Sequence, residues 1–78
     1  MKLSFSEGDI IANQREIVIR LSNKSRTTLQ AEVDAITLIG GVNVINAVGS
    51  GAKWSVKLDD EEQLQQLAEE IGIAIEYY

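Results

Sequence analysis

Apolar and polar residues alternate along most of the first 58 residues of the chain, and this feature constrains the fold more than any other. Such alternation is typical of β-strands that bury one face, because successive side chains of a strand point to opposite sides of its sheet. The clearest runs are residues 2–6, 9–12, 15–21 and 52–58. We therefore expect a mainly antiparallel sheet whose strands are joined by short polar turns.

Residues 27–39 fit two local structures. On a helix, Leu29 and Ile36 would belong to one apolar stripe, whereas on a strand apolar residues would occupy every second position of the first part of the segment. Register favours strands, because hairpin pairing then places the apolar residues of six consecutive strands on one face. We expect strands that bend near Asp34, and the alternative is a second helix at 28–39.

The expected hairpins decide which apolar residues share a face. A three-residue turn at 49–51 would pair Asn46 with Trp54 and leave one amide on the apolar face, where it could line a small polar pocket. The other pairs that we expect are Phe5 with Ile10, Ile10 with Ile17, Ile19 with Leu29 and Ile39 with Val42. The apolar face would then contain Leu3, Phe5, Ile10, Ala12, Ile17, Ile19, Leu21, Leu29, Ala31, Val33, Ala35, Ile39, Val42, Val44, Val48, Ala52, Trp54, Val56 and Leu58.

A helix is expected at about 60–71, where apolar residues recur with helical spacing. Asp59 or Asp60 can cap its N-terminus, and Gly72 suits the position that follows the last turn. The four consecutive acids at 59–62 favour the positive end of the helix dipole. Neighbouring residues on a helix point away from one another, so we interpret these carboxylates as capping residues rather than as metal ligands.

Residues 73–77 alternate again and predict a final strand, which would pair with either strand 52–58 or strand 2–6. The expected fold class is therefore α+β. We predict a single domain over residues 1–78, built as a curled, mainly antiparallel six-strand meander that one C-terminal helix covers.

The composition excludes many kinds of chemistry. The chain has no His and no Cys, so the usual neutral-pH base, the thiolate nucleophile and the commonest metal ligands are absent. No Ser, Lys or Tyr lies in a pattern that would set a nucleophile beside a base. We therefore expect no enzymatic activity, no cofactor and no metal site.

The net charge of −5 is divided unevenly along the chain. Residues 1–30 contain five bases and three acids, whereas residues 31–78 contain two bases and nine acids. The candidate contacts for an anionic ligand or a nucleic acid are Arg15, Arg20, Lys24 and Arg26. No aromatic residue accompanies them to stack on a base, which disfavours nucleic acid.

Ile36, Leu38, Ile45 and Ala47 fall on the second face of the expected sheet. Apolar residues that cluster on an exposed face indicate an interface. We therefore expect a non-catalytic interaction module that forms a homodimer through these four residues, although a different protein partner is possible. The alternative function is a small binding protein for an anionic ligand or a nucleic acid.

Three segments, GVNVI at 41–45, KWSVKLD at 53–59 and EQL at 62–64, resemble a family of short bacterial proteins of unknown function. The resemblance implies a chain of similar length and no particular activity or ligand. The first residues do not form an apolar signal segment, and no apolar run approaches the roughly 18 residues of a membrane span. We therefore expect a cytoplasmic protein with no membrane partner.

Overall fold

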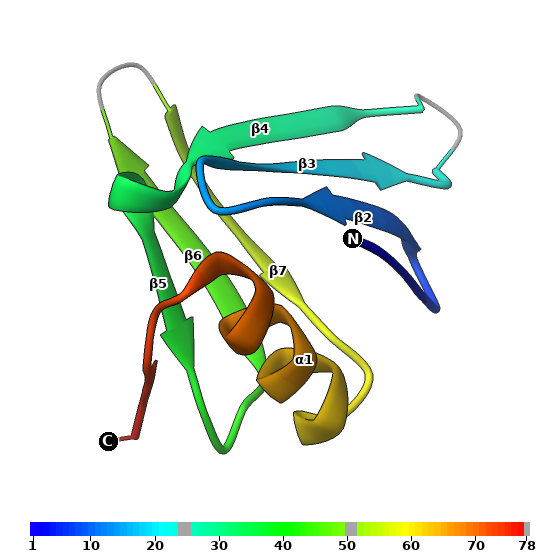
Figure 1. Cartoon of the computed structure of the whole chain (residues 1–78). Coiled ribbons are helices and arrows are strands. Elements are labelled where there is room, and N and C mark those ends of the chain that lie inside the picture. The colour runs from blue at the N-terminus through cyan, green and yellow to red at the C-terminus, as the bar shows by residue number, and fades with distance from the viewer. Residues whose placement is uncertain (24–25, 50–51, 78) are drawn as a thin grey trace.

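The computed structural model describes residues 1–23, 26–49 and 52–77 of the 78-residue chain. Over these residues the chain forms two four-stranded sheets and one α-helix, which confirms the α+β class (Figure 1). Sheet A has the strand order β1-β2-β3-β4, and sheet B has the order β7-β6-β5-β8. The elements are β1 (Lys2–Phe5), β2 (Gly8–Ala12), β3 (Glu16–Leu21), β4 (Thr28–Glu32), β5 (Ile36–Ile39), β6 (Val44–Gly49), β7 (Ala52–Lys57), α1 (Glu61–Ile71) and β8 (Ile75–Glu76).

The expected single six-strand meander is wrong, because the chain changes sheets between β4 and β5. β4 pairs back with β3, β5 pairs forward with β6, and a three-residue 3₁₀ turn, η1 (Val33–Ala35), separates them. The bend expected near Asp34 is therefore confirmed. The alternative helix at 28–39 is not formed, since Thr, Val and Ile side chains in this segment favour strands over a helix.

Sheet A buries the face that the sequence predicts, although two of its registers differ. Ile10 pairs with Ile19 rather than Ile17, and Leu3 rather than Phe5 lies opposite Ile10. The expected pairing between β3 and β4 is confirmed. A shift of two residues leaves every side chain on its original face, because side chains alternate with a period of two.

Gly8 explains why the first turn closes one residue earlier than expected. This glycine pairs with Phe5 and Leu21 inside sheet A and has a φ of 157°. A Cβ atom at position 8 would collide with the backbone carbonyl oxygen of Arg20 on β3. Gly8 therefore serves as a strand residue that lets two backbones approach closely, and not as a turn residue.

Sheet B differs from the expected register by one residue between β6 and β7. Ala47, and not Asn46, lies opposite Trp54, because the hairpin encloses two residues rather than three. Residues 50–51, which complete the expected turn, lie outside the described residues. A one-residue slip moves the side chains of a strand to the opposite face, so the faces of β6 and β5 are exchanged relative to the prediction.

The exchange decides which residues form the core. Ile36, Leu38, Ile45 and Ala47 are at most 8% exposed and lie in the core, so the prediction of an exposed interface at these four residues is wrong. The opposite register would have buried Thr37 and Asn46. Among the described residues the core contains no polar side chain, and burying one without partners is costly.

The β5–β6 connection is also longer than expected. Ile39 pairs with Val44 instead of Val42, so residues 40–43 form the loop and the expected two-residue turn is wrong. Asn43 adopts a left-handed conformation with a φ of 59°, which Asn tolerates better than most side chains do. This two-residue shift does not exchange faces.

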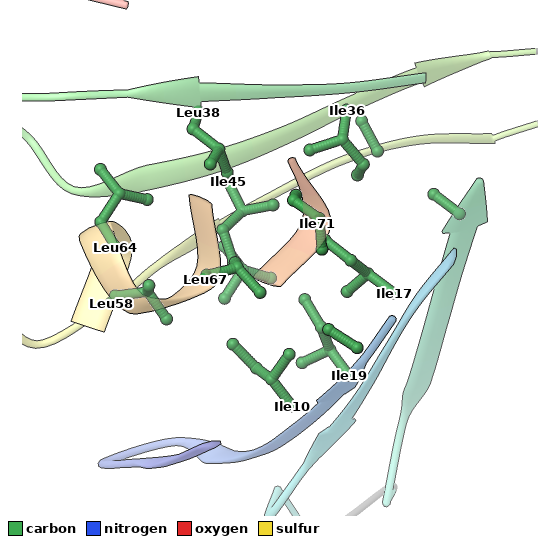
Figure 2. Close-up of a cluster of buried hydrophobic side chains, with 14 of the residues drawn as sticks. Ile10, Ile17, Ile19, Ile36, Leu38, Ile45, Leu58, Leu64, Leu67 and Ile71 are labelled. Atoms are coloured by element: carbon green, nitrogen blue, oxygen red, sulfur yellow. The ribbon is translucent and has the colours of Figure 1, made fainter. Parts of the chain in front are cut away.

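Helix α1 fills the angle between the two sheets. Figure 2 shows Leu64, Leu67 and Ile71 of α1 pointing toward Leu38 and Ile45 of sheet B, with side chains of sheet A closing the cluster from the other side. The sheet A residues in this cluster are Ile10, Ile17 and Ile19, all 0% exposed. One core thus joins both sheets and the helix into a single domain.

The caps of α1 agree with the sequence. The Asp60 carboxylate accepts a hydrogen bond of 2.9 Å from the backbone N–H of Gln63, and Gly72 ends the helix with a φ of 76°. The expected helix at about 60–71 and its caps are therefore confirmed.

Strand β8 pairs with β5, so both partners expected for the final strand are wrong. The pairing is parallel and places Ile75 beside Leu38 and Glu76 beside Ile39. Helix α1 carries the chain across β6 to the open edge of β5, where Ile75 can add to the core. Gly40 leaves room for the ring of Tyr77 beside this strand, which a Cβ atom at position 40 would displace.

Candidate interaction surface

The outer face of sheet B, opposite the core, is the surface that the corrected register brings into view. Helix α1 and sheet A both lie on the core side of sheet B (Figure 1). Val48 on the outer face is 57% exposed, whereas Thr37, Ile39, Val44 and Asn46 are half-buried by their neighbours in the sheet. Three apolar side chains therefore lie on a face that no other described element of the chain covers.

The strand registers arrange this face in cross-strand rows. The first row runs from β8 to β7 as Glu76, Ile39, Val44 and Lys57. The second row contains Thr37, Asn46 and Ser55, and the third contains Val48 and Lys53. An acid therefore lies at the β8 edge, two bases lie at the β7 edge, and aliphatic side chains lie between them.

The middle row has its own hydrogen bond. The Ser55 hydroxyl donates to the Asn46 carbonyl oxygen at 2.8 Å, which leaves the Asn46 amide group with two N–H donors directed away from that bond. The polar pocket expected between Asn46 and Trp54 is wrong, because the two side chains lie on opposite faces. Trp54 packs against the core instead, and its indole N–H has no hydrogen-bond partner among the described residues.

The basic residues that the sequence groups together are divided by the fold. Arg15 lies in the turn before β3, whereas Arg20 lies near the far end of that strand, about 17 Å away at about 3.3 Å per residue. Arg20 and Arg26 line one hollow of about 440 Å³, and Arg15 lines a different one with Glu16 and Glu32. Lys24 lies outside the described residues.

The acidic residues before and within α1 have structural partners. The Asp59 carboxylate accepts hydrogen bonds from the hydroxyl and the backbone N–H of Ser6, at 2.6 and 2.9 Å. These bonds hold the pKa of Asp59 below its usual value, chiefly through the hydroxyl. The phenol of Tyr77 donates to Glu61 at 2.6 Å, and this bond raises the pKa of Tyr77.

The prediction that these acids act as capping residues is confirmed for Asp60, whereas Asp59 and Glu61 bind neighbouring segments. Asp60 caps α1, Asp59 ties the start of the helix to the β1–β2 turn, and Glu61 holds the C-terminal strand. Over residues 1–23, 26–49 and 52–77, no group of three or more His, Cys, Asp or Glu side chains could hold a metal ion. No helix in that part of the chain is long and apolar enough to cross a membrane.

The chain belongs to the family described as "Protein of unknown function (DUF3389)", whose model matches residues 1–75. This confirms the membership of a family of unknown function that the sequence indicates. No curated protein and no solved structure matches the chain. The function must therefore be argued from the surface of this molecule.

The outer face of sheet B differs from the predicted one because the β6–β7 hairpin encloses two residues, whereas the sequence predicts a three-residue turn. A sequence signal for it lies in Thr37 and Asn46, the two polar residues that the predicted pairing places among the apolar residues of the core face. Two polar residues in an otherwise apolar face indicate a register error, because buried polar groups need partners.

Proposed function

We propose that the protein is a non-catalytic interaction module that pairs with a second copy of itself through the outer face of sheet B. The single observation that carries the proposal is that the rows of this face are complementary to themselves. The apolar and charged positions of the first row, and Thr37 and Asn46 in the second, meet suitable partners when two copies stack face to face about a two-fold axis parallel to the strands.

The two-fold axis places β5 of one copy over β6 of the other and the β8 edge of one over the β7 edge of the other. Ile39 then packs on Val44 of the second copy, and Thr37 faces the free amide donors of Asn46. At each edge of the stack, Glu76 lies near Lys57 of the other copy. Two sheets that pack face to face in this way are about 10 Å apart, as in a β-sandwich.

The size of the face predicts a weak dimer. Strand spacings of about 4.8 Å and a rise of about 3.3 Å per residue give the four-stranded face an outline of about 19 by 17 Å. Allowing for the relief of the side chains, each copy buries roughly 500 Å², which is at the lower end of specific interfaces. We therefore expect a dissociation constant of about 10–100 µM, in the range of transient complexes.

Pairing by strand edges is less favourable than pairing by faces. The free edge of sheet B at β7 carries Lys53 and Lys57 on one face. In an antiparallel β7–β7 pair these lysines would lie close to their own copies, and like charges on neighbouring strands are destabilising. The same lysines at the rim of a face-to-face dimer meet the acidic edge of the partner.

Sedimentation velocity over about 1–500 µM protein tests the proposal, since this range brackets the expected constant. Val44→Lys should abolish the dimer, because it places an ammonium group against Ile39 of the second copy. Val18→Lys is the matched control, since Val18 is also a half-buried Val on the outer face of a sheet, but in sheet A. The control should dimerise like the unmodified protein.

Charge exchange identifies the geometry. Lys57→Glu and Glu76→Lys should each weaken the dimer at least about fivefold at low salt, because each creates two like-charge contacts. The double variant should recover most of the loss. The proposal is refuted if the protein is a monomer throughout the concentration range, or if the Val44→Lys protein still dimerises. The two-fold arrangement is refuted if the losses caused by the two single charge changes add in the double variant.

A further inference from the structure

The hollow beside Arg20 and Arg26 on sheet A is a second surface feature, independent of the face of sheet B. It has a volume of about 440 Å³ and lies where β2, β3 and β4 meet the loop after β3. Its polar lining includes the two guanidinium groups, the hydroxyl residues Ser22 and Thr28, and one carboxylate, Asp9.

Arg20 lies between Asp9 and Thr28 in one cross-strand row of sheet A. The Asp9 carboxylate accepts a hydrogen bond of 2.7 Å from the Ser4 hydroxyl on its other side. Within the described residues Asp9 and Arg20 form no ion pair. The guanidinium of Arg20 therefore retains its donors for a ligand in the hollow.

Arg26 is held in a conformation that few side chains adopt. Its φ of 50° lies in the left-handed region, which costs an ordinary residue about 1 kcal/mol or more. Asn23 maintains this conformation, because its carbonyl oxygen accepts from the Arg26 N–H at 3.0 Å and its side-chain oxygen accepts from the Thr27 N–H at 3.1 Å. The Leu21 N–H then bonds the Thr27 carbonyl at 2.8 Å, so the loop returns Arg26 to the end of β3.

A Gly or Asn at position 26 would relieve the strain, yet the chain has Arg there. Strained non-glycine residues concentrate at binding sites, where the surrounding contacts keep a side chain in place. Arg26 and Arg20 thus approach one hollow from two separate elements, a loop and a strand.

We propose that this hollow binds the dianion of a phosphate monoester through Arg20 and Arg26. Guanidinium groups match the geometry of phosphate oxygens with paired N–H donors, and the hydroxyls of Ser22 and Thr28 can supply further hydrogen bonds. A phosphate monoester, with a second pKa near 6, carries close to two negative charges at pH 7.5, which two guanidinium groups can balance.

The surroundings favour a small anion over a nucleic acid. The described residues that line the hollow include no aromatic side chain on which a base could stack. The net charge of −5 repels a long polyanion, whereas a small ligand responds mainly to charges within a Debye length of about 10 Å. Residues 1–30, which contain the hollow, carry five bases and three acids.

A change at Asp9 should alter the ligand affinity in the opposite direction to the changes at the arginines. Its carboxylate lines the same hollow and repels an anion there. Asp9→Asn keeps an oxygen that can accept the Ser4 hydrogen bond and removes the charge. If the ligand binds in this hollow, Asp9→Asn should tighten binding while the arginine changes weaken it.

The experiment is a titration of the ¹⁵N-labelled protein with O-phosphoserine at low salt and pH 7.5, followed by amide chemical shifts. Serine, which lacks the phosphate, serves as the control ligand. We expect shifts at the residues lining the hollow and a dissociation constant of about 1 mM, which is typical of an exposed site with two charged contacts. The same spectra report whether each variant is folded.

Arg20→Gln and Arg26→Gln should each weaken binding at least fivefold, and Asp9→Asn should tighten it about twofold. Arg15→Gln removes the same charge from the other end of β3 and should change the constant less than twofold. The proposal is overturned if the chemical shifts change only in other regions, or if all three arginine changes weaken binding equally. It is also overturned if a single-stranded oligonucleotide binds more tightly than phosphoserine.

Discussion

Leu38 and Ile39 are neighbours on β5 that lie on opposite faces of sheet B, and truncating each of them tests the fold directly. Leu38 is 0% exposed and lies in the core on the face of sheet B that the helix covers, whereas Ile39 is half-buried on the outer face. The expected register would have given the reverse assignment. The two substitutions, Leu38→Ala and Ile39→Ala, therefore discriminate between the two registers.

The structure gives the magnitude of each effect. Leu38→Ala removes three buried carbon atoms, which costs about 2.4 kcal/mol of transfer free energy at about 0.8 kcal/mol per methylene. The cavity adds about 24 cal/mol per Å³ that does not collapse, so the total loss of unfolding free energy is about 3–4 kcal/mol. Ile39→Ala should cost about 1 kcal/mol or less, mostly through strand propensity.

Urea unfolding followed by the fluorescence of Trp54, the only tryptophan, measures both values. Protein at about 2 µM keeps the dimer dissociated, so that self-association does not add to the stability of the folded state. A domain of this size has a total stability of about 4–12 kcal/mol, so the loss at Leu38 is easily resolved. If Ile39→Ala costs as much as Leu38→Ala, the assignment of the faces of β5 is wrong.

Two further predictions concern the backbone and the ends of the helix. Gly8→Ala should destabilise the protein by about 3 kcal/mol, because the new Cβ atom collides with backbone on β3. Gly41→Ala should cost only about 1 kcal/mol, since its φ of 82° is strained but its surroundings are open. Equal losses of melting temperature in the two variants would contradict this prediction. Because the pKa of Asp59 is lower in the folded state, its carboxylate stabilises the fold at pH values above the unfolded pKa of about 3.9. This stabilisation is lost as the pH falls through the folded pKa. Ser6→Ala should therefore raise the Asp59 pKa, measured by NMR titration, and flatten the acid side of the stability profile; an unchanged pKa would contradict the assignment of its cause.

The candidate sites differ in how far the sequence could predict them. Arg20 and Arg26 line one hollow, because one lies at the end of a strand and the other in the loop that follows it. Arg15, which the sequence places in the same group, lines a different hollow, since it lies at the opposite end of the same strand. Proximity in sequence indicates proximity in space only across a turn, and an extended strand separates its ends by about 3.3 Å per residue.

The local features of the chain follow from the sequence alone. The alternation of sheet A and the helix with its Asp60 and Gly72 caps depend on contacts within a few residues, and the bend near Asp34 follows from the pairing of consecutive strands. In sheet A the observed registers differ from the predicted ones by an even number of residues, so the predicted core-facing side chains are unchanged.

Sheet B was decided only by the tertiary structure. One residue fewer in the hairpin before β7 exchanges the faces of β5 and β6, and the partner of β8 depends on which strand edge the helix leaves open. The chain adopts the register that buries Leu38 and Ile45 and leaves Thr37 and Asn46 outside. That preference is a free-energy difference between two complete cores, which the polar positions of Thr37 and Asn46 indicate but do not decide.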